Sequence, residues 1–204
     1  MNRSNSLSRS QNQTKAQSDI AKGAYVLLLW LNSSEYVTVG KLGTISFARG
    51  FYAYVGSAMG VAGFKRVGRH LDVAAGHRKT QKWHVDYLLP VSEVIKTVEI
   101  ETQERIECRI AQRLWKNPSL ASIKGFGSSD CRCCSHLFYS RRRNDLEDAA
   151  QRLIYDPVWG HLVNQSPQGL RKEYNRREQV RTGYLISALN RDCAKEEHLN
   201  GNSD

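Results

Sequence analysis

Apolar residues from residue 23 onward follow the pattern of β-strands. Residues 24–31 are almost entirely apolar, which suits a buried strand, and glycines interrupt the segments that follow. The pattern predicts an antiparallel meander whose turns or bulges are marked by glycine. We expect its strands at residues 24–31, 35–42, 44–48 and 51–57.

Beyond residue 60 the apolar residues recur every three or four positions, which predicts a helix over residues 61–75. Gly68 lies in its middle and weakens it by about 1 kcal/mol relative to alanine. A second amphipathic pattern predicts a helix over 102–116, which ends before Pro118. Further strands are expected at 83–89, 94–101 and 136–139, a loop at 123–129, and charged helices at 145–155 and 170–189.

These elements predict an α+β fold, with a small central antiparallel sheet flanked by helices and a helical C-terminal extension. Residues 1–19 hold almost nothing to bury, so we expect a disordered tail. Residues 20–140 form the predicted domain, and 141–204 form a charged helical extension. The hydrophobic stripes of that extension are thin, so it is either a helical appendage or a segment that depends on a protein partner.

Composition excludes several classes of protein. The 204 residues contain no apolar run of 18, so no membrane span is expected. Residues 1–19 lack the apolar core of a secretory signal. Five cysteines are an odd number, which argues against a disulfide scaffold and favours reduced thiols and a cytoplasmic location.

The net charge of +10 is concentrated in the middle of the chain, where residues 20–140 carry +7. Residues 65–82 contain six basic side chains and one acidic side chain. Such a local excess favours a polyanionic partner, because neutralising phosphates releases condensed counterions. A solvated basic face is the alternative explanation. The basic residues of this segment are Lys65, Arg66, Arg69, Arg78, Lys79 and Lys82.

Glu107 interrupts the apolar stripe of the second predicted helix, between Ile106 and Ile110. A carboxylate that faces inward is costly unless a cation or a metal ion pairs with it. The alternative is a residue at the edge of the stripe that reaches water or a salt bridge. Glu107 is therefore a candidate metal ligand.

The first predicted helix brings three polar residues to one face. Arg66, Arg69 and His70 are three and four positions apart, so they are neighbours on the helix surface. Two guanidinium groups in this arrangement suit a phosphate, although single surface arginines are more often solubilising charges.

Two tyrosines also stand out, Tyr25 at the head of the first strand and Tyr54 near the end of the fourth. A buried tyrosine is usually a core residue with one hydrogen bond. To act as a base, its hydroxyl would need a nearby cation that lowers its pKa. Arg66 or a metal ion is the candidate cation.

The order of these features resembles the GIY-YIG nuclease superfamily: Gly-x-Tyr opens a strand, Tyr-x-Gly closes a later one, and Arg-x-x-Arg-His and an inward Glu follow on two helices. Within it the chain is most similar to a branch found alone or fused to endonuclease III-type DNA glycosylases. The resemblance covers residues 23–139, and an extra hairpin at 39–50 separates the two tyrosines. Its closer matches are residues 54–58, 69–70, 83–88, 107–108, 126–131 and 135–139.

The resemblance implies a metal-dependent endonuclease that hydrolyses phosphodiester bonds of nucleic acid. The processes it implies for such an enzyme are DNA repair or DNA processing. It places Tyr25 and Tyr54 beside the scissile phosphate, with one of them helping to deprotonate the attacking water. Arg66 would stabilise the phosphate charge, His70 would assist, and Glu107 would hold one Mg²⁺ or Mn²⁺ ion. The expected partner is nucleic acid, DNA in particular.

Several residues around this set are candidates for binding nucleic acid: Arg69, Arg78, Lys79, Lys82 and His84. His84 and Asp86 share one face of the strand expected at 83–89, so they either line the cleft or form a structural pair. The alternative to catalysis is a nucleic-acid-binding module of the same fold, and a third possibility is an adaptor that binds a protein through residues 141–204.

The cysteine-rich stretch around residue 131 is a weaker candidate for a metal site. Zinc usually takes its four ligands from two separated clusters, whereas these residues crowd into six positions with Cys108 as the one plausible outside donor. We therefore expect buried thiols or loop packing rather than zinc. The stretch contains Cys131, Cys133, Cys134 and His136.

Overall fold

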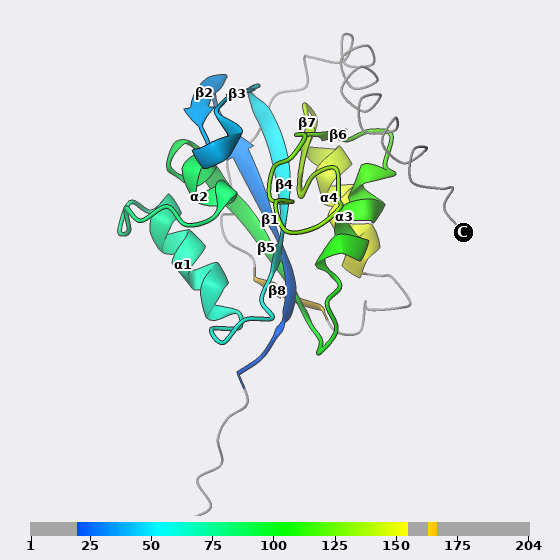
Figure 1. Ribbon diagram of the computed structural model, residues 1–204. Coiled ribbons are helices and arrows are strands. Elements are labelled where there is room, and N and C mark those ends of the chain that lie inside the picture. Colours follow the sequence, from blue (N-terminus) through cyan, green and yellow to red (C-terminus); the bar gives the residue numbers. More distant parts are fainter. Residues whose placement is uncertain (1–19, 155–162, 167–204) are drawn as a thin grey trace, which may run out of the picture.

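The computed structural model describes residues 20–154 and 163–166 (Figure 1). The tail expected at 1–19 and the helix expected at 170–189 lie outside these residues. The strands are β1 Gly23–Leu31, β2 Glu35–Thr38, β3 Thr44–Phe47, β4 Gly50–Ser57, β5 Glu93–Glu101, β6 Ala121–Ser122, β7 Leu137–Ser140 and β8 Val163–Ser166. The α-helices are α1 Lys65–Ala74, α2 His84–Leu88, α3 Glu107–Trp115 and α4 Arg143–Ile154.

The central sheet has the strand order β6-β7-β4-β1-β5-β8, and every pair in it is antiparallel. The apolar strand β1 lies in the middle, between β4 and β5. It is buried along nearly its whole length, as its composition predicts. The α+β class and the helix-flanked antiparallel sheet are therefore confirmed.

Alternate side chains of β1 enter two separate cores. Val26 and Leu28 face the core shared with α3 and α4, whereas Tyr25 and Leu27 face the core shared with α1 and α2. Figure 1 shows these helix pairs on opposite sides of the sheet. Because side chains alternate along a strand, the Tyr25 hydroxyl lies on the face of the sheet that α1 and α2 cover.

Helix α4 packs on the sheet although the sequence places it in the extension. Its buried side chains, Leu146, Ala149, Ala150 and Leu153, belong to the core beneath α3. The four strands expected as one antiparallel meander do not form one: β1 pairs directly with β4, while β2 and β3 form a separate two-stranded sheet between them in sequence. This hairpin begins at Glu35, before the expected bounds of 39–50, and the second half of the strand expected at 35–42 is a 3-10 helix, Gly40–Leu42.

The strand predicted next to Pro90 is also wrong. Residues 83–89 were expected as a strand, but His84–Leu88 form the short helix α2. The Asp86 carboxylate accepts hydrogen bonds from the backbone N–H groups of Lys82 and Trp83, at 2.8 and 3.0 Å, and so caps the start of the helix. The apparent alternation of polar and apolar residues here is short enough to fit one helical turn as well as a strand.

The two main helices begin later than their apolar stripes suggest. α1 begins at Lys65, because residues 61–64 form turns in which Gly63 has φ +50°. α3 begins at Glu107, so this carboxylate lies in the first turn of the helix. No described helix is long and apolar enough to cross a membrane.

Candidate functional site

Tyr25 and Tyr54 lie on adjacent strands and face the same core. Tyr25 is opposite Gly56 in the β1–β4 pair, and the two tyrosine rings are 6.4 Å apart. A Cβ at position 56 would lie 2.2 Å from Tyr25 Cζ and 2.4 Å from its hydroxyl. Gly56 is therefore required by the ring of Tyr25 rather than by a turn.

His70 of α1 connects Tyr25 to a buried carboxylate. The Tyr25 hydroxyl lies 2.8 Å from His70 Nε2, and His70 Nδ1 lies 2.8 Å from Asp86 Oδ1. An ionised carboxylate only accepts hydrogen bonds, so Nδ1 carries the proton that is donated to Asp86. In the neutral ring, Nε2 then accepts the hydroxyl proton of Tyr25.

Asp86 is the anchor of this chain of hydrogen bonds. It is fully buried and also accepts Arg69 Nη1–H at 2.8 Å, besides the two backbone N–H groups at the start of α2. Burial alone would raise the pKa of Asp86, but these hydrogen bonds lower it to about 2. The carboxylate is therefore ionised at neutral pH and fixes the orientation of His70.

Arg66 is half-buried and lies beside the same cluster. Its Nη1 donates to the carbonyl of Ser57 at 2.6 Å, and its guanidinium stacks on the Trp83 ring at 4.5 Å. Burial raises the pKa of both Tyr25 and Tyr54 well above the usual value, and the charge of Arg66 opposes that rise. The structure thus brings together four predicted residues, Tyr25, Tyr54, Arg66 and His70.

Cations gather around Trp83. The guanidinium of Arg69 lies 4.5 Å from the ring centroid and the ammonium of Lys82 lies 4.9 Å from it, in addition to Arg66. Arg78 and Lys79 follow α1 and are exposed. Arg69, predicted to bind nucleic acid, also holds Asp86 and the Thr80 carbonyl, so part of its role is structural.

Glu107 belongs to the helical layer on the other side of the sheet. Its Oε2 is buried and has no hydrogen-bond partner among the described residues. Its charge acts on His136, and a Cβ at Gly127 would lie 3.0 Å from both His136 Cβ and Tyr54 Cε2. His136 and Gly127 therefore connect Glu107 to the tyrosine cluster.

His84 is oriented toward the loop that contains Gly127. Its Nδ1 accepts the Gly127 backbone N–H at 2.9 Å, and burial lowers the pKa of its ring. The expected pairing of His84 with Asp86 on one strand face is not found. The ring belongs instead to the contact between α2 and the 123–129 loop.

Two functional-site residues were not singled out by the sequence. The sequence predicts Asp86 only as a neighbour of His84 on one strand face, and it includes Trp83 only within the matching residues 83–88. The sequence signal for Asp86 was its position three residues after Trp83, which is the position of a helix-capping carboxylate.

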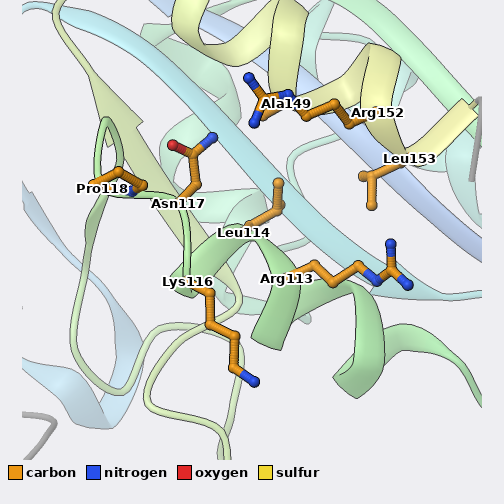
Figure 2. A pocket seen from close by; sticks show the side chains of 8 residues that line it. All are labelled: Arg113, Leu114, Lys116, Asn117, Pro118, Ala149, Arg152 and Leu153. Carbon is orange, nitrogen blue, oxygen red and sulfur yellow. The ribbon is translucent and has the colours of Figure 1, made fainter.

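A separate hollow of about 300 Å³ lies between α3 and α4 (Figure 2). Leu114, Ala149 and Leu153 line it together with polar and basic residues. It is on the side of the sheet away from Tyr25, and no described tyrosine, histidine or carboxylate lines it. The Tyr25–His70–Asp86 series is therefore not in this hollow.

One family model matches the chain, over residues 24–157, and its description is Domain of unknown function DUF123. The matched segment contains the tyrosine cluster, Glu107 and all of α4. No curated protein and no solved structure matches the chain.

Proposed function

The chain belongs to the DUF123 family, and we propose that it is a divalent-metal-dependent endonuclease that hydrolyses phosphodiester bonds of nucleic acid, DNA in particular. The observation that carries the proposal is the hydrogen-bonded series Tyr25–His70–Asp86, which lies beside Tyr54 and Arg66. The series supplies what proton transfer needs, a neutral imidazole at the Tyr25 hydroxyl and an ionised carboxylate behind that imidazole.

The proposed chemistry begins with Tyr25. His70 Nε2 takes the hydroxyl proton, and the ionised Asp86 stabilises the imidazolium that results. The phenolate left on Tyr25 accepts a proton from the attacking water. Arg66 makes this step less costly, because its charge favours the phenolate and the developing charge on the phosphate.

Glu107 fits the metal that the proposal requires. A buried carboxylate oxygen without a hydrogen bond is costly, and carboxylate oxygens are the ligands that Mg²⁺ and Mn²⁺ prefer. Glu107 would hold the ion. When bound, such an ion supplies positive charge to the phosphate and lowers the pKa of a bound water.

The basic surface next to the cluster supports a polyanionic substrate. Arg78, Lys79 and Lys82 are exposed, and Trp83 offers a partly exposed aromatic ring beside them. Basic side chains beside an aromatic ring suit single-stranded or distorted nucleic acid, because a base can stack on the ring when a guanidinium that covers it moves to a phosphate.

The test is cleavage of a panel of single-stranded, duplex, branched and mismatched DNA and RNA with Mg²⁺ or Mn²⁺. The wild-type chain should cleave at least one substrate, and Glu107→Ala should remove that activity. Glu104→Ala is the matched control, because Glu104 is an exposed carboxylate near the start of the same helix. If the wild-type chain and Glu107→Ala are equally inactive or equally active on every substrate, catalysis through Glu107 is ruled out.

A second function, nucleic-acid binding without cleavage, is favoured by the burial of the two tyrosines. Tyr25 is 1% exposed and Tyr54 is 5% exposed, so a phosphate reaches them only if side chains above them move. This function predicts salt-dependent binding that survives Glu107→Ala. Binding would weaken when Arg66, Arg69 and Lys79 are neutralised.

A further inference from the structure

Four atoms of the types that bind transition metals converge at the start of α3. They are the sulfurs of Cys108, Cys131 and Cys133 and an imidazole nitrogen of His136, and all of them lie within 4.8 Å of one another. Cys108 comes from the first turn of α3, and the other three come from the loop before β7. The outside donor that the sequence left isolated is thus brought to the cysteine-rich stretch.

The separations are those of one coordination sphere. Tetrahedral zinc has Zn–S distances of about 2.3 Å and Zn–N distances of about 2.0–2.1 Å, so its ligand atoms are roughly 3.5–3.8 Å apart. His136 Nε2 lies 3.4 Å from Cys131 Sγ and 3.9 Å from Cys108 Sγ. Shifts of a few tenths of an ångström to about 1 Å would complete the geometry.

The backbone holds the loop in place for these ligands. The His136 N–H donates to the Phe126 carbonyl at 2.7 Å, and the Val55 N–H on β4 donates to the His136 carbonyl at 2.9 Å. Ser135 Oγ donates to the Ile123 carbonyl at 2.6 Å. The imidazole is therefore presented from a braced segment, as is expected of a preorganised ligand set.

We infer that Cys108, Cys131, Cys133 and His136 bind one zinc ion in a closed structural site. Three thiolates and one imidazole in tetrahedral array suit zinc, and four protein ligands leave no open position for substrate. A single ion fits because all four ligand atoms belong to one compact group. Binding releases the three thiol protons to solvent as the thiolates form bonds to the metal.

The site would join two parts of the molecule that are far apart in the sequence. It ties the first turn of α3, which contains Glu107, to the loop that packs against Tyr54 through Gly127. The inference rests on the ligand geometry alone and does not require the proposed nuclease activity. If both are correct, the zinc ion fixes the position of Glu107 relative to the tyrosines.

The experiment uses the full chain, purified under reducing conditions from zinc-supplemented cells and analysed for metal per chain by mass spectrometry. We expect about one zinc per chain for the wild type. Cys108→Ser and Cys133→Ser should lose at least most of it. Cys134→Ser is the matched control, since Cys134 lies in the same stretch but outside the four-ligand group, and it should keep the wild-type content.

A second measurement covers variants that fail to fold. The wild-type chain, stripped of metal and titrated with Co²⁺, should develop thiolate-to-cobalt absorption and the intense visible bands of tetrahedral cobalt, which zinc then removes. Glu107→Ala should retain both zinc and the cobalt spectrum, so loss of the nuclease and loss of the zinc site are distinguishable. A wild-type chain that binds neither metal, or that carries an iron–sulfur chromophore instead, overturns the inference.

Discussion

Asp86→Asn tests the hydrogen-bonded series at its anchor. The substitution keeps the size of the side chain but removes its charge, and it replaces one accepting oxygen by an NH₂ group. Four donors converge on the carboxylate: His70 Nδ1, Arg69 Nη1 and the backbone N–H groups of Lys82 and Trp83. At least one of them must lose its partner in the variant.

The expected loss of stability follows from the pKa. The folded-state pKa of Asp86 is about 2 and its ordinary value is 3.8, which corresponds to about 2 kcal/mol of stability at neutral pH. Leaving Arg69 without its buried partner adds to this, so we expect Asp86→Asn to cost about 3 kcal/mol at pH 7. Because the folded-state pKa is the lower one, the contribution is complete above the unfolded-state pKa and is lost as the pH falls toward 2.

Urea unfolding of the wild type and of Asp86→Asn, followed by tryptophan fluorescence at pH 7 and pH 3, measures this directly. The difference between the two proteins should shrink by about 1 kcal/mol at pH 3, because protonated Asp86 begins to resemble asparagine. Asp72→Asn, which changes an exposed carboxylate on α1, should have little effect at either pH. A difference for Asp86→Asn that is the same at both pH values would refute the assignment of Asp86 as an ionised anchor.

Three further predictions concern the surroundings of the site. Gly56→Ala should displace the Tyr25 ring and lower both the free energy of unfolding and any cleavage rate. Gly68→Ala is the matched control: the new methyl group has open space around it, so this substitution should stabilise α1 by about 1 kcal/mol in thermal unfolding. Burial lowers the pKa of His84, so the free energy of unfolding should rise as the pH increases through the unfolded-state pKa near 6.5. His84→Asn should flatten that rise, which urea titrations at pH 5 and pH 7 measure. Lys79→Ala should reduce the slope of log binding constant against log salt by about 1 in fluorescence anisotropy with labelled DNA, and an unchanged slope would remove Lys79 from the interface.

Much of the fold is readable from the sequence because the signals are local. The apolar run of β1 and the three-to-four spacing in α1 and α3 each reflect residues that are neighbours along the chain. The same holds for Glu107, whose place inside an apolar stripe predicts a carboxylate turned toward the protein, and its buried Oε2 agrees with that.

The contacts within the site could not be predicted in the same way. Tyr25 and His70 are 45 residues apart, and their hydrogen bond depends on how α1 packs on the sheet. Cys108 joins Cys131 only because α3 begins beside the loop before β7. The strand predicted at 83–89 is wrong because the Asp86 carboxylate, which looks like one polar position in an alternating strand, caps the helix α2 instead.

Single-turnover cleavage by Tyr25→Phe, on the nucleic acid that the wild-type chain cleaves fastest, tests the proposed mechanism most directly. The substitution removes only the hydroxyl, so binding should be unchanged while the cleavage rate falls by about 100-fold or more, the usual contribution of a general base. Tyr36→Phe is the matched control, because Tyr36 is 79% exposed and lies in the separate hairpin. A Tyr25→Phe chain that cleaves as fast as the Tyr36→Phe control would contradict the account.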